Sequence, residues 1–540
     1  MKHAISLVLT LTLALGLLSA CSNNTPAASS TPLIQADDIQ QPSENTAGTS
    51  TINKPQKDVV SSRDTLRVAF KSEVQGVDPY TQGVTGTTVA GLIFDSLTER
   101  VADGSIAPNL AESWEVVDDT TWRFKLREGN NFTNGEVCNA QTFVSTWDIL
   151  KQDDITWPNK GDMAAIIDSI EAVGDYEILI HTKMPYSMLP LRMSLLRPIA
   201  PEDYANRGEE GLLNSPVGNG SYMLESYERG GTTKLTANPD HIDGAAPIKN
   251  LEFTVITDPS SRVAALEAGD VDLINGIPFN ELNRLSQNPN LVVAARPTTF
   301  TLFLQFSQYA NPALQDVRVR KALSMALDMD SIVDDVLDGC GGKINTPIFN
   351  PSYTGYDPDV KRLPYDPDGA KALLADAGYG SGLTLTLSFT PGSHAGVADA
   401  AQVMKQMWAE IGVTVELQEV ESGLLQQQYL AKETSDMVIN ALGGTQGTGT
   451  VVANMAFCPD QRFSVYNDPA FAELRDKAEA ELDETKRNEL LHDLQQYSVD
   501  NAIGVGLWQI YEGWAWDKDL QGFDPYTTTL MLNVRNCWFQ

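Results

Sequence analysis

Hydrophobic and polar residues alternate in several short stretches of this sequence, which is the pattern of β-strands with one buried face. From Thr65 to Phe70, the apolar Leu66, Val68 and Phe70 fall on one side. The same pattern predicts further strands in SWEVVDD, TWRFKLREG, YEILIHT, TKLTAN and NLEFTVIT.

Other stretches repeat their apolar residues at helical spacing. The clearest stripe consists of Val403, Met404, Met407, Trp408 and Ile411. It predicts the buried face of a helix that Gly412 ends, followed by a strand in which Val413, Val415 and Leu417 alternate. We interpret the stripe as packing surface and not as a cofactor site.

Further helices are expected where a capping residue precedes a helical pattern. We expect one to begin near Thr87 or Thr88, and others to begin at aspartates. These aspartates are Asp258, for which Ser260 is the alternative, Asp316, Asp330 and Asp366. Strands and helices mixed in this order predict an α/β fold.

Length and composition allow a large core. The chain has 540 residues, of which 42% are hydrophobic, enough for roughly three domain-sized units of about 150 residues. A formal net charge of −33 makes nucleic acid an unexpected partner, because each phosphate contact needs a lysine or arginine.

The N-terminus predicts export. Residues 1–20 have a short basic start and an apolar run that is too short to span a membrane, as in a secretory signal peptide. Leu18-Ser19-Ala20-Cys21 resembles the lipobox of bacterial lipoproteins, in which lipid chains are attached to the cysteine. Lipidated Cys21 would hold the protein on a membrane, and the Ser-, Thr- and Pro-rich residues 21–63 predict a flexible tether.

Four cysteines remain after the lipobox: Cys138, Cys340, Cys458 and Cys537. Outside the cytoplasm this even number permits two disulfides in any of three pairings. None of the cysteines lies in a zinc-type motif, and the five histidines are scattered. We therefore expect no metal and no cofactor.

Signatures of common enzymes are absent from the sequence. It contains no G-x-S-x-G, S-x-x-K, H-E-x-x-H or G-x-x-x-x-G-K-[ST] pattern. We therefore predict no enzymatic activity.

One uncharged window stands out in this acidic chain. No Asp, Glu, Lys or Arg occurs from Met437 to Pro459, a segment that contains NALGGTQGTGTVVANM. The window lacks the lysine of a phosphate-binding loop. It offers backbone groups, threonine hydroxyls and the Gln446 amide for neutral hydrogen bonds.

Several long segments resemble one family along nearly all of residues 64–540. They are PNLAESWEVVDDTTWRFKLREGNNFTNGEVCNAQTFVSTWDIL, SPVGNGSYMLESYERGGTTKLTANPDHI and DVRVRKALSMALDMDSIVDDVLDGCG. They resemble the extracytoplasmic solute-binding proteins of ABC importers, family 5, which bind dipeptides, oligopeptides, nickel and some oligosaccharides.

This resemblance implies a two-lobed clamshell, the periplasmic-binding-protein fold of type II. Lobe one is expected from residues 64–107, 221–309 and 506–540, with an extra subdomain at 108–220. Lobe two is expected at 310–505. Hinges near 309 and 506 would let the lobes close on a ligand.

The resemblance also implies where the ligand lies. In peptide-binding relatives, the segment like NALGGTQGTG carries an aspartate that pairs with the peptide ammonium, and here Thr445 takes that position. The loop that contains His394 lacks the arginine of the dipeptide binder. The expected ligand-binding residues are Thr85, Gly86, Thr87, His394, Gly444, Thr445, Gln446, Trp508, Tyr511 and Trp514.

The function predicted on this basis is capture of peptides, oligopeptides above all, by a monomer on the outer face of the cytoplasmic membrane. Its partners would be an ABC permease and ATPase. An oligosaccharide ligand is the alternative, since the ionic anchor is missing and tryptophans are present. An extracytoplasmic enzyme or a sensory binding protein is a more remote alternative.

Overall fold

The computed structural model describes residues 59–80, 84–101, 105–152, 155, 160–337, 339–443, 448–525 and 534–540. All of them belong to one compact unit, residues 33–540. Cys21 and the segments predicted as signal peptide and tether lie outside the described residues, apart from residues 59–63. Among the described residues, no helix has the length and hydropathy needed to cross a membrane.

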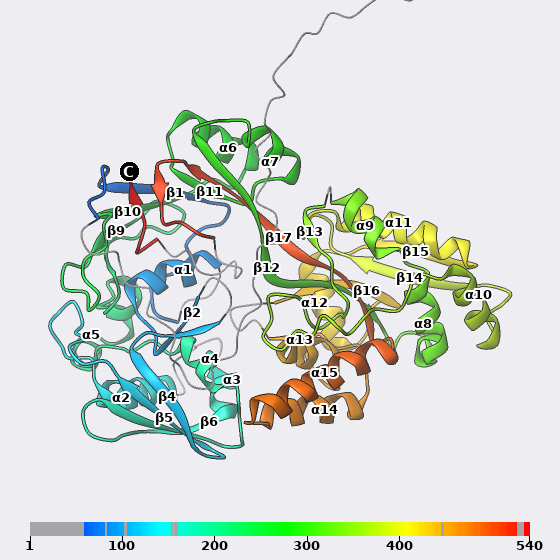
Figure 1. The fold of residues 1–540 in the computed structure, drawn as a ribbon, viewed down its shortest axis with the longest axis horizontal. Helices are drawn as coiled ribbons and strands as arrows, with labels where there is room; N and C mark the ends of the chain where they lie inside the picture. Colours follow the sequence, from blue (N-terminus) through cyan, green and yellow to red (C-terminus); the bar gives the residue numbers. More distant parts are fainter. Residues whose placement is uncertain are drawn as a thin grey trace, which may run out of the picture. The chain divides into compact units, whose positions relative to one another are not determined.

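A large mixed sheet dominates the fold (Figure 1). Its strand order is β15-β14-β16-β12-β17-β11-β1-β10-β9-β8, and β13 pairs with β17. The strands are β1 (Thr65–Phe70), β8 (Tyr222–Ser226), β9 (Thr233–Ala237), β10 (Asn250–Val255), β11 (Leu273–Asn275), β12 (Leu291–Phe306), β13 (Gly341–Gly342), β14 (Leu383–Phe389), β15 (Val413–Glu419), β16 (Met437–Leu442) and β17 (Gly504–Asp517).

The two longest strands of this sheet, β12 and β17, run antiparallel side by side (Figure 1). One end of the pair adjoins β11, and the other end adjoins β16. Their register shifts between Pro297 and Thr301 and again between Leu302 and Phe303. Such irregularities bend a strand pair locally.

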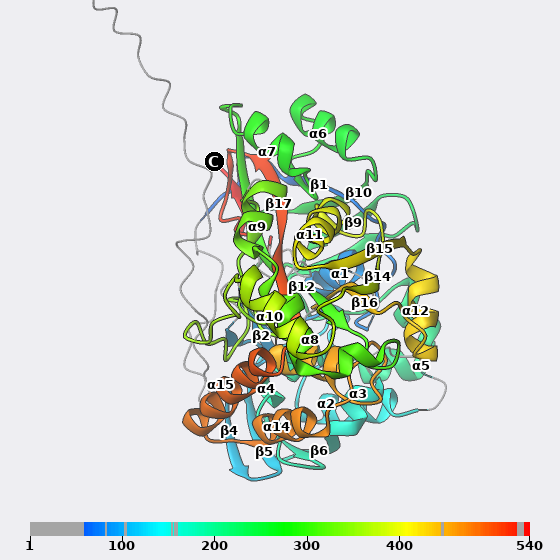
Figure 2. The ribbon, with the colours of Figure 1, turned by 90° about the vertical axis from the view of Figure 1, so that its right-hand side faces the viewer.

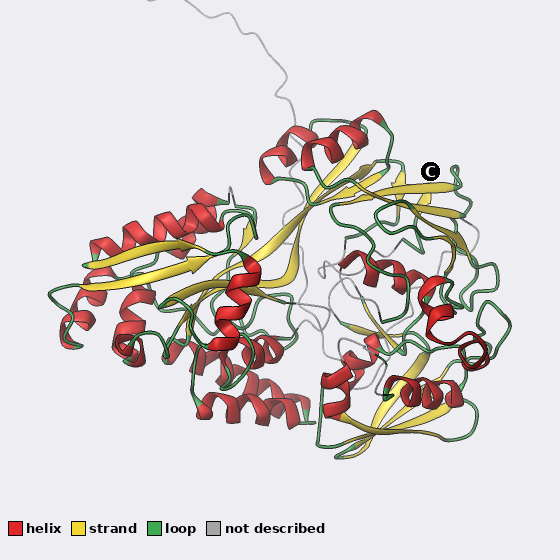
Figure 3. Cartoon of the chain, turned by 180° about the vertical axis from the view of Figure 1, so that it is seen from behind, coloured by secondary structure: helices red, strands yellow, loops and turns green. Residues whose placement is uncertain are grey.

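A second sheet of four strands, with order β4-β5-β7-β6, packs with α2 (Figure 3). Its bounds are β4 (Ala111–Asp118), β5 (Thr121–Leu126), β6 (Ile167–Ala172), β7 (Glu177–Thr182) and α2 (Ala140–Leu150). Two small two-stranded sheets are β2 (Thr98–Arg100) with β3 (Ile106–Pro108), and β18 (Leu520–Gln521) with β19 (Trp538–Phe539).

The remaining helices flank these sheets, and α14 lies beside α15 (Figure 2). They are α1 (Val84–Ile93), α3 (Lys160–Ile166), α4 (Leu189–Arg192), α5 (Pro201–Asn214), α6 (Pro259–Ala268), α7 (Phe279–Leu285), α8 (Val317–Met325), α9 (Met329–Val336), α10 (Pro367–Asp376), α11 (Val397–Glu410), α12 (Ser422–Ala431), α13 (Gly449–Phe457), α14 (Pro469–Ala480) and α15 (Glu484–Asp500), with 3₁₀ turns at Met193–Leu195 and Pro312–Gln315.

Most of the local predictions are confirmed. β1 has the predicted bounds, and Asp258, Asp316 and Asp366 cap α6, α8 and α10. In the predicted stripe, Met404, Trp408 and Ile411 are buried, and Val403 and Met407 are partly buried. The Trp408 indole donates to the Leu323 carbonyl at 2.9 Å.

Several local expectations are wrong. α1 begins at Val84, so the Thr85–Thr88 segment lies inside the helix and does not precede it. Asp328, and not Asp330, caps α9 by accepting from the Ser331 amide, because the helix starts one residue earlier than Asp330. Within the uncharged window, Thr448 caps a helix, α13.

The two-disulfide arrangement is also not formed. Cys138 and Cys458 are free thiols buried in two different apolar cores. Burial raises the pKa of both thiols, that of Cys458 to about 11.

A buried ionic cluster lies beside the large sheet. His241 Nε2 is 2.9 Å from Asp95 Oδ2, and only 1% and 3% of these side chains are exposed. Arg535 Nη1 is 3.8 Å from the same carboxylate, and Arg535 also donates to the buried Glu99. We call Asp95, Glu99, His241 and Arg535 the buried cluster.

The first and last described segments lie together. The Ser62 amide donates to the Phe539 carbonyl at 2.9 Å, and the Arg63 guanidinium lies 3.5 Å from the Phe539 ring centroid. The Ser62 hydroxyl donates to the Gln540 carbonyl at 2.8 Å. Residues 61–63 are therefore fastened to residues 539–540.

Candidate functional site

Parallel strands end at two places in the large sheet. β1 is parallel to β10 and β11, and β14 is parallel to β15 and β16. In open α/β sheets, ligands bind outside the carboxyl ends of parallel strands. Each group of strands has a cavity at that end.

The first cavity has a volume of about 590 Å³. We call it the ionic pocket. It is lined by Lys71 after β1, Thr257 after β10 and Gly276 after β11, and by the middle of β17. Its remaining lining residues are Pro259, Arg262, Ile277, Pro278, Phe279, Cys340, Gly392, Ser393, His394, Ala395, Trp508, Ile510, Tyr511, Glu512 and Gly513.

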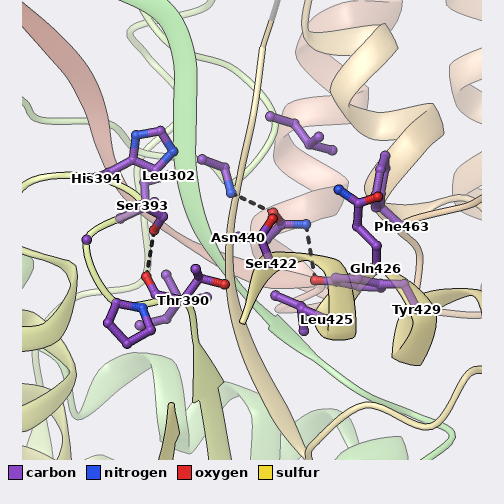
Figure 4. Close-up of a pocket in the computed structure, with 15 residues that line it drawn as sticks. Leu302, Thr390, Ser393, His394, Ser422, Leu425, Gln426, Tyr429, Asn440 and Phe463 are labelled. Atoms are coloured by element: carbon purple, nitrogen blue, oxygen red, sulfur yellow. Dashed lines mark hydrogen bonds between the residues drawn. The ribbon is translucent and has the colours of Figure 1, made fainter. Parts of the chain in front are cut away.

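The second cavity has a volume of about 410 Å³, and we call it the neutral pocket (Figure 4). Its walls come from the segments that follow β14 and β15 and from the end of β16. Its polar side chains are those of Thr390, Ser393, His394, Ser422, Gln426, Tyr429 and Asn440. None of its described lining residues is Asp, Glu, Lys or Arg.

Hydrogen bonds position the polar side chains of the neutral pocket. The Asn440 side-chain amide donates to the Tyr429 hydroxyl at 3.1 Å, and the Tyr429 hydroxyl donates to Gln305. The Ser393 hydroxyl donates to the Thr390 carbonyl at 2.8 Å (Figure 4). These bonds fix the wall without any formal charge.

The loop after β14 joins the two cavities, because Gly392, Ser393 and His394 line both. The His394 ring centroid lies 6.5 Å from that of Phe300. Burial, and next the charge of Lys71, lower the pKa of His394 to about 4. The imidazole is therefore neutral at pH 7 and offers one donor and one acceptor.

The charges of the ionic pocket centre on Lys71 and Glu512. Lys71 Nζ lies 2.8 and 3.0 Å from the two carboxylate oxygens of Glu512, and the Asn275 amide donates to Glu512 Oε1 at 3.4 Å. The Lys71 side chain is 46% exposed and that of Glu512 is 10% exposed. The pair thus forms part of the cavity wall.

Arg262 shapes the same wall. Its guanidinium donates to the carbonyls of Asn275 at 2.8 Å, Gly276 at 2.7 Å and Ile256 at 2.6 Å. Gly276 has φ +67°, and a Cβ there would lie 2.8 Å from Lys71 Cδ. The positive φ favours a glycine at this turn.

The structure brings together some of the residues expected from the sequence. His394, Trp508 and Tyr511 line the ionic pocket. Trp514 does not, because it is buried in an apolar core with its ring centroid 5.9 Å from that of Phe523.

The other expected residues lie elsewhere. Thr85, Gly86 and Thr87 are in the first turn of α1, and Gly86 and Thr87 are not among the described residues that line these two pockets. Gly444, Thr445 and Gln446 lie outside the described residues. They fall between Leu442, which lines the neutral pocket, and Thr448, which caps α13.

Sequence reasoning missed Lys71 and Glu512. Lys71 is the first residue after a correctly predicted strand, and that position was the available signal. Glu512 lies 441 residues away and had no local signal.

The arrangement is suited to holding a polar ligand. It provides neutral hydrogen-bonding groups in one pocket and one half-exposed ion pair in the other. Within the described ranges, no group of three or more His, Cys, Asp and Glu side chains could hold a metal ion.

The chain is similar to known proteins. A model of the family described as bacterial extracellular solute-binding proteins, family 5 middle, matches residues 105–463. The nickel-binding periplasmic protein of Escherichia coli (strain K12) is 26% identical over 466 residues, which cover 82% of this chain and 88% of that protein. Di/tripeptide-binding protein 2 of Pseudomonas aeruginosa is 26% identical over 467 residues, which cover 80% and 87%.

A solved structure extends the likeness to the fold. The ABC transporter substrate-binding protein CtaP of Listeria monocytogenes has a TM-score of 0.80 at 20% identity, over 88% of this chain and 99% of that one. This score confirms the predicted fold class, α/β with the two-lobed architecture.

Proposed function

This chain belongs to the bacterial extracellular solute-binding proteins of family 5, and from that premise we propose that it captures peptides for an ABC importer. It binds oligopeptides outside the cytoplasmic membrane and delivers them to the permease. Its role is binding and not catalysis, like that of its relatives.

The observation that carries this proposal is the pair of cavities at the ends of parallel strands. Each has a volume within the range of about 300–1,000 Å³ that is typical of ligand sites. They share the loop 392–394, so a ligand longer than one residue can occupy both. A peptide backbone needs neutral donors and acceptors, and the neutral pocket supplies Asn440, Tyr429 and Ser393.

Closure around the ligand uses β12 and β17. These strands connect the sheet region at the ionic pocket with that at the neutral pocket. Their register shifts between Pro297 and Thr301, and this irregularity supports bending of the strand pair at that point. The shift precedes the hinge expected near 309 by about ten residues. The boundaries expected for the two lobes and the extra subdomain remain part of this proposal.

Lipid on Cys21 anchors the protein to the outer face of the membrane. Labelling of growing cells with radioactive palmitate tests this anchor. The wild type is expected to carry label and to sediment with membranes. Cys21→Ser should remove both properties, and a label that persists in Cys21→Ser would contradict the assignment.

Native mass spectrometry of the gently purified protein tests peptide capture. We expect the protein to carry a spread of peptide masses from the host cell. An unliganded protein that takes up defined oligosaccharides and no peptides would contradict the proposal. That outcome would favour the oligosaccharide alternative, which the uncharged neutral pocket also suits. Turnover of the bound molecule would instead favour an enzyme.

A further inference from the structure

The lining of the ionic pocket carries more positive than negative side chains, unlike the chain as a whole. Its described lining residues include two cations, Lys71 and Arg262, and one carboxylate, Glu512. His394, which faces the same cavity, is neutral at pH 7. An excess of positive charge therefore lines this cavity, although the chain as a whole carries a formal charge of −33.

The two cations have different tasks. The Arg262 guanidinium donates to backbone carbonyls from two turns, so it holds the wall in place. Lys71 donates to a side chain, Glu512, and is almost half exposed. An exposed ammonium on a long side chain can change partners, because water solvates it when it leaves the carboxylate.

Glu512 would keep partners if Lys71 turned away. The Asn275 amide donates to it, and the charge of Arg262 acts on it through the same wall. Its carboxylate would thus remain hydrogen-bonded and compensated, as a buried charge must be. After such a change of partner, the Glu512 carboxylate would still be hydrogen-bonded.

We propose that Lys71 binds a carboxylate of the captured ligand, taking it in exchange for Glu512. The ligand class is therefore a molecule with at least one carboxylate, such as a peptide with a free C-terminus, placed with that group in the ionic pocket. Neutral groups of the same ligand lie in the neutral pocket. This assignment rests on the proposed function, because it presumes that the cavities hold the transported peptide.

Two forms of one peptide mixture test the assignment. The probe is a peptic digest of serum albumin, either untreated or methyl-esterified so that its carboxylates are neutral. Both are offered to the purified protein, first freed of bound ligand, and the retained masses are measured by native mass spectrometry. We expect the esterified digest to bind at least tenfold more weakly than the untreated one.

Variants of Lys71 and of a control lysine test whether Lys71 itself causes the preference for free carboxylates. Lys71→Met is expected to bind the untreated digest at least tenfold more weakly and to lose the preference for free carboxylates, whereas Lys71→Arg keeps it. Lys343→Met is the matched control, because Lys343 is also 46% exposed and paired with an aspartate, but lines neither pocket. It should behave as the wild type. Glu512→Gln should bind the untreated digest more tightly, since Lys71 loses its competing partner.

The outcomes distinguish the two proposals. Equal binding of both digests by the wild type, or an unchanged preference in Lys71→Met, would overturn the role of Lys71 and leave peptide capture standing. Weaker binding of the untreated digest by Glu512→Gln would also overturn the exchange. Binding of neither digest would overturn peptide capture and this assignment together.

Discussion

The buried cluster and the ionic pocket both place charges beside the same large sheet, but they differ in access to water. Asp95 and His241 are 3% and 1% exposed, whereas Lys71 is 46% exposed. A buried charge cannot lose its partner without a large penalty, while a half-exposed one can. The comparison teaches that exposure, more than pairing, separates ions that hold the fold from ions that can meet a ligand.

Removal of the carboxylate at the centre of the buried cluster should give the largest effect. Asp95→Asn leaves the His241 imidazole without the carboxylate that pairs with it inside the protein, whereas Arg535 keeps Glu99. We expect the free energy of unfolding to fall by about 3–5 kcal/mol, measured by urea unfolding with tryptophan fluorescence. Asp203→Asn, which breaks the exposed pair with Arg207, should cost less than about 0.5 kcal/mol. Equal losses of unfolding free energy in the two variants would contradict the difference between buried and exposed ions.

The pH dependence of stability should report the same cluster. Burial alone would lower the pKa of His241, but the Asp95 carboxylate outweighs it and raises that pKa above 6.5. The charged imidazolium therefore stabilises the fold fully below pH 6.5, and this contribution is lost as pH rises through the higher folded pKa. Each unit of that increase is worth about 1.4 kcal/mol.

Urea unfolding of the wild type between pH 6 and pH 9 measures this contribution. His241→Gln cannot be protonated, so its stability should fall less over the same range. The difference between the two slopes isolates His241 from other titrating groups. Parallel slopes would show that the His241–Asp95 pair contributes nothing that depends on pH.

The ion pair of the ionic pocket should matter little for stability. Lys71→Met and Glu512→Gln are each expected to change the free energy of unfolding by less than about 1 kcal/mol, because the Lys71 ammonium reaches solvent and the buried Glu512 side chain keeps the Asn275 amide as a partner. The same urea experiment without ligand provides the measurement. A loss as large as that of Asp95→Asn would mean that the pair holds the fold, and the contrast between the two regions would disappear.

The smallest expected effect concerns His394. Lys71 lowers its pKa, although burial lowers it more. In Lys71→Met the pKa of His394 should therefore rise only partway from about 4 towards its usual range, which an NMR titration of the imidazole protons can follow. Lys343→Met should leave the pKa unchanged. A full return to the ordinary value would show that burial has no share in it.

Local parts of the fold were predictable because their causes are local. Asp258, Asp316 and Asp366 cap helices through bonds to residues two or three positions away, and the alternation in β1 is visible in six residues. The start of α1 was missed because glycine and threonine at 85–88 resemble a loop by propensity.

The site was predictable only in part. His394, Trp508 and Tyr511 followed from the resemblance and line a described cavity, while Trp514 fills a core instead. The partnership of Lys71 with Glu512 depends on how β1 and β17 assemble in one sheet. No pattern within a short window contains that information, so the ion pair could not be read from the sequence.

The fastening of residues 61–63 to residues 539–540 has a consequence for biosynthesis. A chain is made from its N-terminus, and β1 leaves the ribosome more than four hundred residues before β17, which completes its part of the sheet. The edge of β11 that β17 will cover must therefore stay open while the middle of the protein is made. The final structure of this part of the sheet becomes available only when the last residues emerge.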